Sequence, residues 1–287
     1  MEHPAELAVH QYMESAVKGN STMSEDTINQ VASDIKEALT KQFNSKKSRD
    51  NFTLRMSNVG RPACQLWYDK NKPEVAIAPP TTFLMNMMIG DIVEAVFKGI
   101  LKEAGVKYKN SDSVKLELDG TTINGTYDIV IDDAVDDIKS ASDWSYKYKF
   151  ESFDTLKQGD SFGYVSQLAG YAKASGLKAG GWWVVNKATG AFKYIRAKWL
   201  DIEEEIHLIQ SRVNQLKKNK FVRKFQPVTE MFRSKATGNM ILNSGCKFCA
   251  YRFDCWPTLQ EIPSLVSQAK DPKIVQYVEI EEKYKNA

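Results

Sequence analysis

The chain has 287 residues, of which 43% are hydrophobic and 11% aromatic, and its formal net charge is +3. This composition supplies enough apolar side chains for a packed core and excludes a globally disordered chain. No apolar run approaches the roughly 20 residues of a membrane-spanning helix, so we expect no membrane partner. The N-terminus contains acidic residues and lacks the pattern of a secretory signal, which favours a cytoplasmic protein with reduced thiols.

Helical and strand periodicities then alternate along the chain. Residues 24–43 predict an amphipathic helix with Ser24 as its N-cap, and residues 81–105 predict a second helix that ends at Gly105. The later elements are three strands within 113–142, a helix over 162–176, a hairpin over 180–197, a charged helix over 199–219 and a helix-like charged tail. This order predicts an α/β fold around a small mixed sheet.

Charged residues interrupt two of the predicted strands, in the segment GTYDIVIDDAVDDIKSAS (125–142). Residues two apart on a strand share a face, so Asp137 and Lys139 point the same way while Ile138 points into the core. Asp128 on the preceding strand is expected beside them. Converging carboxylates repel each other unless a cation lies between them, and hard oxygen ligands suit Mg²⁺ or Mn²⁺. The alternative for an isolated Asp-x-Lys is a solvent-facing ion pair on an edge strand.

A divalent cation with a lysine beside it suits hydrolysis of a phosphodiester bond. The metal would lower the pKa of a bound water, and the water would attack the phosphorus in line. Lys139 could orient or deprotonate that water, or stabilise an oxyanion. The acidic strand pair therefore predicts a metal-dependent nuclease.

Asp128 followed by Asp137-Ile138-Lys139 resembles the signature of PD-(D/E)xK nucleases, with Tyr127 where the proline of that name would stand. Downstream, Gln167 and Tyr171 share a helical face and resemble the Gln-x₃-Tyr motif of the RecB-like branch. The resemblance implies a restriction-endonuclease-like core with helical extensions. It also implies five catalytic residues, namely Asp128, Asp137, Lys139, Gln167 and Tyr171.

The metal ligands implied by the resemblance are Glu94, Asp128, Asp137 and the backbone carbonyl of Ile138. RecB-like nucleases carry Gly-x₃-His in the upstream helix, whereas this chain has Gly90 and Glu94 at those positions. A glutamate can bind Mg²⁺, although loss of the nitrogen ligand weakens the preference for Mn²⁺. The alternative is that Glu94 lies on the polar face of its helix.

Four cysteines, Cys64, Cys246, Cys249 and Cys255, form one distant thiol plus Cys-x₂-Cys-x₅-Cys. A closed zinc site usually has two close pairs, and sets of four thiolates also hold [4Fe–4S] clusters. The arrangement resembles the iron–sulfur nucleases, which include CRISPR-adaptation, AddB-type and phage exonucleases. That resemblance implies a structural [4Fe–4S] cluster. A zinc ion and buried structural thiols are the alternatives.

The stretch after the second acidic strand interleaves aromatic and basic residues. Trp144 and Tyr146 could stack on bases of DNA, while Lys147 and Lys149 neutralise phosphates. The alternative is an ordinary amphipathic strand. The basic clusters at 46–49 and 216–224 are further candidate phosphate contacts, although such runs are usually solvated surfaces.

We therefore expect a Mg²⁺- or Mn²⁺-dependent deoxyribonuclease, with an exonuclease favoured over an endonuclease, that acts on single- or double-stranded DNA. By resemblance it is phage-type, with recombination or replication proteins as candidate partners in the cytoplasm of a bacterial host. A non-catalytic iron–sulfur or zinc DNA-binding module is the alternative. The expected segments are a helical extension (1–55), the nuclease core (56–235) and a cysteine-containing segment with the tail (236–287), together forming one compact domain.

Overall fold

The computed structural model describes residues 3–44 and 52–285. Contacts divide the chain into two compact units: unit 1 is Met1–Arg49, Thr53–Arg61 and Pro80–Asn214, and unit 2 is Asp50–Phe52, Pro62–Pro79 and Gln215–Ala287. These units divide the chain elsewhere than the three segments expected from the sequence, whose boundaries stay a prediction. The basic cluster at 46–49 lies outside the described residues. Within the described ranges, no helix is both long and apolar enough to cross a membrane.

Unit 1 is a mixed sheet covered by helices, which confirms the predicted α/β class. Its strands are β1 (Lys109–Leu118), β2 (Thr121–Ile131), β3 (Ala134–Ala141), β4 (Lys178–Asn186) and β5 (Phe192–Arg196). They pair in the order β1-β2-β3-β4-β5, and only the β3–β4 pair is parallel. The helices are α1 (Pro4–Val17), α2 (Glu25–Asn44), α3 (Met56–Val59), α5 (Thr81–Glu103), α6 (Phe153–Gln158), α7 (Tyr164–Ser175) and α8 (Ile202–Lys218), whose last turn belongs to unit 2.

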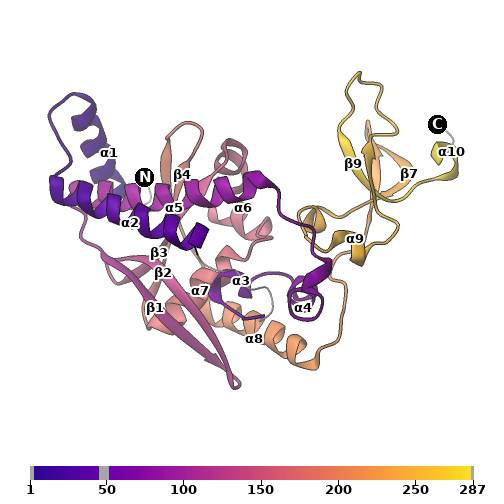
Figure 1. Cartoon of the computed structure of the whole chain (residues 1–287), viewed down its shortest axis with the longest axis horizontal. Helices are drawn as coiled ribbons and strands as arrows, with labels where there is room; N and C mark the ends of the chain where they lie inside the picture. The colour runs from indigo at the N-terminus through magenta and orange to yellow at the C-terminus, as the bar shows by residue number, and fades with distance from the viewer. Residues whose placement is uncertain (1–2, 45–51, 286–287) are drawn as a thin grey trace. The chain divides into compact units, whose positions relative to one another are not determined.

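Helices α5 and α7 lie on opposite sides of this sheet (Figure 1). The core on the α5 side consists of Val9, Phe97, Leu101, Ile129, Ile131, Ile138, Trp183 and Tyr194. Burying an apolar side chain of this size contributes about 1.5–3 kcal/mol. Ile138 points into this core as predicted, so its neighbours Asp137 and Lys139 point to the other face.

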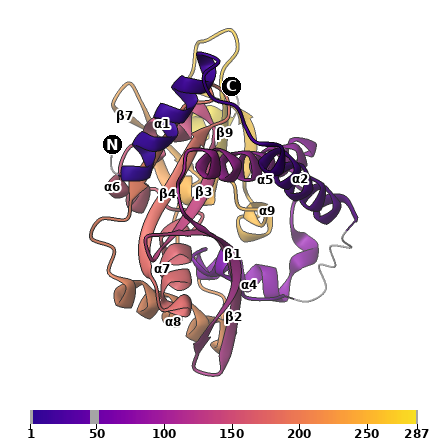
Figure 2. The same cartoon turned by 90° about the vertical axis from the view of Figure 1, so that its left-hand side faces the viewer.

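The β1–β2 hairpin extends beyond the other strands (Figure 2). β1 pairs with β2 as far as the turn at Leu118 and Thr121, whereas β2 meets β3 only over Ile129–Ile131. The N-cap predicted at Ser24 is present. The Ser24 hydroxyl accepts the Thr27 N–H at 3.3 Å at the start of α2.

Two stretches differ from the sequence expectations. The aromatic and basic residues Ser145–Lys149 form a π-helical turn, closed by a bond from the Phe150 N–H to the Ser145 carbonyl at 2.8 Å, so the strand alternative is wrong there. The tail, expected to be helical, forms strand β9 (Ile274–Glu279) before the short helix α10 (Glu282–Lys285). β9 pairs on both sides with other strands, and this pairing outweighs the local helical pattern.

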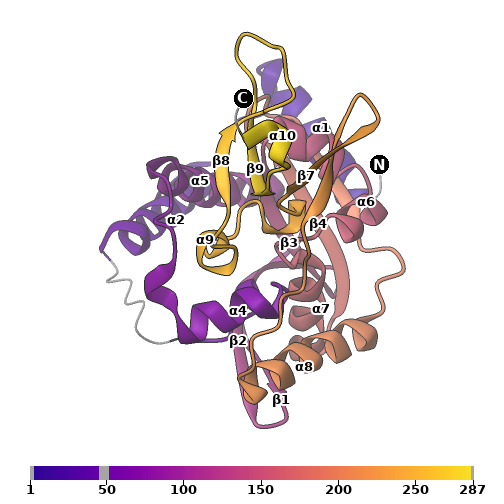
Figure 3. The same cartoon turned by 90° about the vertical axis from the view of Figure 1, so that its right-hand side faces the viewer.

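Unit 2 contains an antiparallel sheet that sequence reasoning missed (Figure 3). Its strand order is β6-β7-β9-β8, with β6 (Val228–Phe232), β7 (Lys235–Ile241) and β8 (Gln260–Pro263). Short helices α4 (Ala63–Asn71) and α9 (Arg252–Cys255) and the 3₁₀ turns Pro73–Val75 and Ser244–Cys246 complete the unit. The buried Glu230 carboxylate accepts hydrogen bonds from Thr237, Asn239 and Tyr277, which ties β6, β7 and β9 together.

Candidate active site and cysteine pocket

The two predicted acidic strands bring Asp128 and Asp137 together. The β2–β3 ladder ends at Ile129 opposite Asp136, and continuing that register by one pair sets Asp128 opposite Asp137. Asp128 Oδ2 instead accepts the backbone N–H of Ile138 at 2.7 Å, so a side-chain hydrogen bond replaces the backbone pairing where the two strands separate. Both carboxylates therefore lie at the end of the ladder, on the face away from the α5 core.

Lys139 lies on the same face as Asp137, as the Asp-x-Lys spacing predicts. Lys139 Nζ is 2.5 Å from Asp137 Oδ2, and the exposed fractions of the two side chains are 20% and 3%. The Lys139 ammonium is therefore the charged partner of this buried Asp137 oxygen. A buried carboxylate oxygen in this state is costly unless a cation neutralises it.

The electrostatics of the cluster favour added positive charge. Burial and the neighbouring Asp137 raise the pKa of Asp128 to about 6, against the opposing effects of Lys139 and the Ile138 N–H. Burial also raises the pKa of Asp137, although Lys139 opposes it. Burial acts to lower the pKa of Lys139, but the carboxylates of Asp137 and Asp128 outweigh it and raise that pKa above its ordinary value. The lysine is therefore a fixed positive charge at neutral pH.

Glu94 approaches the cluster from α5. A Cβ on Gly90, one turn earlier, would lie 3.4 Å from Ser140 Oγ, which places this part of α5 against β3. The Glu94 carboxylate is 2.6 Å from Lys98 Nζ. Burial and the Asp128 charge raise the pKa of Glu94, while Lys98 and Lys139 lower it. The charges of Asp128 and Lys139 thus act on the pKa of Glu94, although its ion-pair partner is Lys98.

Gln167 and Tyr171 of α7 meet as their spacing predicts. Gln167 Nε2 donates to the Tyr171 hydroxyl at 3.1 Å, and Tyr171 is buried. Burial and the nearby Asp137 raise the pKa of Tyr171, so its hydroxyl stays protonated. Gly125 of β2 allows this approach, because a Cβ there would lie 2.7 Å from Tyr171 Cε1. The pair therefore lies on the α7 side, where the acidic strands carry their charges.

The donor set suits a hard divalent cation, although the side chains do not enclose one as they stand. No group of three or more His, Cys, Asp or Glu residues in the described part of the chain is arranged as a complete ligand set. The fit rests on the carboxylates of Asp128 and Asp137, which share one lysine, and on the raised pKa values of Asp128 and Glu94. Each of these features records negative charge that burial leaves undercompensated, and carboxylate oxygens are the ligands that Mg²⁺ prefers.

Sequence reasoning missed two residues of this cluster, Lys98 and Tyr164. Lys98 lies one helical turn after Glu94, and that spacing of four is the signal that could have found it. The Tyr164 ring centroid lies 5.1 Å from Lys139 Nζ, a cation–π distance. Tyr164 precedes Gln167 by three residues on α7, so helical periodicity could have placed it on the same face as Gln167 and Tyr171.

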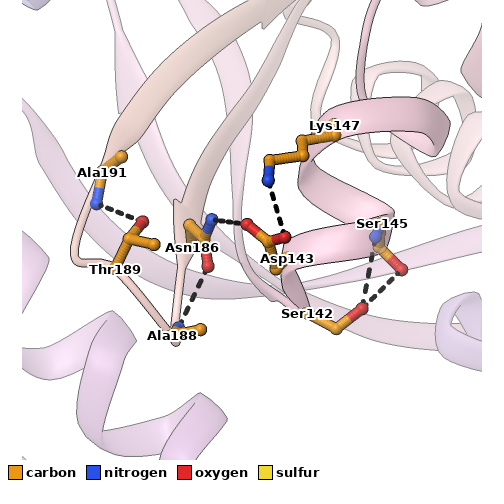
Figure 4. Close-up of polar contacts among 8 residues, drawn as sticks. All are labelled: Ser142, Asp143, Ser145, Lys147, Asn186, Ala188, Thr189 and Ala191. Carbon is orange, nitrogen blue, oxygen red and sulfur yellow. Dashed lines mark hydrogen bonds and ion pairs between the residues drawn. The ribbon is translucent and has the colours of Figure 1, made fainter.

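The expected DNA-contacting stretch begins directly after β3, where Figure 4 shows its polar contacts. Lys147 Nζ is 2.8 Å from Asp143 Oδ2, and Asp143 Oδ1 accepts from Asn186 Nδ2 at 3.1 Å. This ion pair offsets the charge of Lys147. Trp144 is exposed and lies 5.6 Å, centroid to centroid, from the exposed ring of Tyr148.

The other two expected DNA contacts have different surroundings. Lys193 Nζ lies 4.3 Å from the Tyr146 ring centroid and donates to the Tyr146 carbonyl at 2.8 Å. Lys149 Nζ lies 4.4 Å from the Tyr164 ring centroid, beside the ring that Lys139 also contacts. Of the four expected residues, Lys149 is therefore the one linked to the acidic cluster through a shared neighbour.

The four cysteines line one pocket of unit 2. The enclosed volume is about 20 Å³, and Gln65, Tyr68, Arg252 and Trp256 complete its lining. All four thiols are free and partly buried. Burial and the neighbouring thiols raise the pKa of Cys246 to about 12, and burial raises that of Cys249 to about 11. The raised pKa values keep the thiols of Cys246 and Cys249 protonated at neutral pH.

Comparisons with known proteins add little to this geometry. The chain matches no family model and no curated protein. The solved structure described as "Crystal structure of SSO0001" is similar at 14% sequence identity, over 82% of this chain and 98% of that chain, with a TM-score of 0.41. That score is too low to carry an argument about fold or function.

Proposed function

We propose that the protein is a metal-dependent deoxyribonuclease of the RecB-like PD-(D/E)xK type, with unit 1 as its restriction-endonuclease-like core. The observation that carries the proposal is the meeting of Asp128, Asp137 and Lys139 where β2 and β3 separate. A purely structural ion pair would need one carboxylate for one lysine. Two carboxylates carry more negative charge than one lysine neutralises, as their raised pKa values indicate, and this excess charge favours binding of a divalent cation.

Glu94, Asp128, Asp137 and the Ile138 carbonyl are the groups that would hold Mg²⁺ or Mn²⁺. The ion supplies Lewis acidity and a water of lowered pKa when it is bound. Lys139 would orient or deprotonate the attacking water, or stabilise negative charge on the phosphate. Gln167 and Tyr171, hydrogen-bonded to each other on α7, would contact the DNA or Lys139 beside the acidic strands, as the resemblance implies.

The finer assignments follow the resemblance described above. Exonuclease action on DNA, in degradation, recombination or replication, is favoured over endonuclease action. The cysteine pocket is proposed to hold a structural [4Fe–4S] cluster, with zinc as the alternative, and four reduced thiols in one pocket favour a cytoplasmic setting. No step of the hydrolysis requires the cluster.

The test is degradation of linear and covalently closed circular DNA, each single- and double-stranded, with Mg²⁺, Mn²⁺ or EDTA. Wild type is expected to degrade linear DNA with either metal and to be inactive with EDTA. Asp137→Ala and Lys139→Ala are expected to lose at least about 100-fold in rate. Asp133→Asn is the matched control, since it lies in the same hairpin, is highly exposed and has a positive φ that Asn tolerates.

Two outcomes would contradict the proposal. Equal degradation by wild type, Asp137→Ala and Lys139→Ala would mean that the acidic strands are not the active site. DNA binding by wild type without degradation under any of the metal conditions would favour the non-catalytic DNA-binding module instead.

A further inference from the structure

Three aromatic rings of unit 1 stack in a row beside the lysine of the acidic cluster. Phe150 and Tyr164 have ring centroids 6.0 Å apart and planes 23° apart, and Tyr164 and Phe162 have centroids 5.7 Å apart and planes 13° apart. The row runs from the buried Phe150, through the half-buried Tyr164, to Phe162, which is 50% exposed. Its outer ring is therefore accessible for a further stacking partner.

Two lysines border this row. Lys139 Nζ lies 5.1 Å from the Tyr164 centroid. Lys149 Nζ lies 4.4 Å from the Tyr164 centroid and 4.7 Å from that of Phe162. Within the residues that the structure describes, Lys149 has no carboxylate at ion-pair distance. The Asp160 carboxylate acts on Lys149 only from beyond ion-pair distance, so part of the lysine charge remains for an anion next to the exposed ring, whereas Asp143 pairs directly with Lys147.

The loop that carries Phe162 is held in place on both sides. The Asp160 carboxylate accepts the N–H groups of Gly163 at 2.9 Å and Val165 at 2.8 Å, which caps the start of α7. Gly60 and Gly163 touch through their backbones, because a Cβ on Gly60 would lie 2.3 Å from Gly163 Cα. A loop whose backbone is fixed in this way loses little conformational entropy when its exposed ring binds a partner.

We propose that Phe162 is a stacking platform for an unpaired base of single-stranded DNA, with Lys149 contacting the adjoining phosphate. The inference rests on the proposed nuclease function and names the form of its substrate. An aromatic face stacks on any base that is exposed, whereas a base inside a duplex is covered by its neighbours. Because Tyr164 lies between the platform and Lys139, the stacked nucleotide is adjacent to the acidic cluster, and the enzyme acts on unpaired strands.

The experiment measures binding by fluorescence anisotropy in EDTA, so that cleavage plays no part. The probes are a labelled single-stranded oligonucleotide, a single-stranded oligonucleotide of the same length that contains consecutive abasic sites, and a blunt duplex. Phe162→Leu keeps an apolar side chain but loses the ring, and it is expected to bind the single strand about 5- to 100-fold more weakly than wild type. Phe162→Trp is expected to bind as wild type or more tightly. The control is Phe83→Ala, a ring of equal exposure (51%) on α5.

The abasic probe separates stacking from charge. Wild type and Phe162→Leu are expected to bind it equally, and Lys149→Met is expected to weaken binding of both single-stranded probes. If wild type and Phe162→Leu bind the single strand with equal affinity, the platform is overturned while the nuclease proposal stands. If wild type binds none of the probes, and degrades none in Mg²⁺, the nuclease proposal fails and the platform with it.

Discussion

Lys139 Nζ lies 2.5 Å from Asp137 Oδ2, in a part of the sheet where both side chains are largely withdrawn from solvent. Asp128 lies on the adjacent strand, and its carboxylate adds to the negative charge that Lys139 faces. One ammonium therefore offsets two carboxylates. Removing one partner of a buried pair leaves an uncompensated charge, and the cost of that is larger than the net contribution of the intact pair.

Lys139→Met is therefore expected to lower the free energy of unfolding in EDTA by about 3–5 kcal/mol. Added Mg²⁺ should restore part of this loss if the carboxylates bind it. Urea unfolding in EDTA and in Mg²⁺ measures both effects. The control is Lys109→Met, whose partner Asp133 lies 3.9 Å away at an exposed position, so its loss should stay below about 1 kcal/mol. Equal losses in the two variants would show that the Asp137 pair is not effectively buried.

The contact between Gly60 and Gly163 gives a second prediction. Gly163 has a φ of +82° and begins α7, the helix that carries Gln167 and Tyr171. Gly60→Ala would push a methyl group into the Gly163 backbone, so it is expected to destabilise the protein by about 1–3 kcal/mol and to reduce nuclease activity by displacing α7. Thermal unfolding and DNA degradation measure the two effects. Gly159→Ala is the control and should behave as wild type, because a Cβ there would lie 3.4 Å from Thr155 O. If Gly60→Ala has the stability and activity of wild type, the contact with Gly163 is disproved.

The acidic strands and the α7 pair could be predicted because their signals are local. Asp137 and Lys139 are two residues apart on a strand, and Gln167 and Tyr171 are four apart on a helix, so periodicity alone sets their faces. The approach of Asp128 followed from a short hairpin connection. The metal, the cofactor and the reaction assigned to these residues rest on resemblance and stay predictions.

The features that sequence reasoning missed depend on contacts between distant residues. Glu230 is buried only because Thr237, Asn239 and Tyr277 converge on it, and Tyr277 comes from a strand far along the chain. Local pattern had suggested a helix for that strand, because propensity cannot register a pairing partner. The stacked position of Phe162 likewise depends on Gly60, which lies a hundred residues earlier in the sequence.

The cysteine pocket gives a third prediction. Protein purified without oxygen is expected to contain about four iron atoms and about four acid-labile sulfides per chain. Cys64→Ala should lose most of both, because a cluster of this kind needs four thiolates. Ser244→Ala, two residues before Cys246, is the control and should keep its iron. Metal analysis and the visible absorption spectrum provide the measurement. Stoichiometric zinc without iron would reject the cluster in favour of a zinc site.

The last prediction concerns His3, at the start of α1. His3 Nδ1 accepts the Ala5 N–H at 3.0 Å, and its ring lies edge-on to Tyr194 at 4.9 Å. Burial, with the charge of Arg196, lowers the pKa of His3 below 6.5. The unfolded chain therefore binds a proton more readily, so stability is full above about pH 6.5 and is lost as the pH falls through the folded pKa. His3→Asn keeps a capping acceptor but cannot titrate, so it should lose less stability than wild type between pH 7.5 and 5.5 in thermal unfolding. The exposed His207→Gln serves as the control, and an identical pH dependence of His3→Asn and wild type would contradict the assignment.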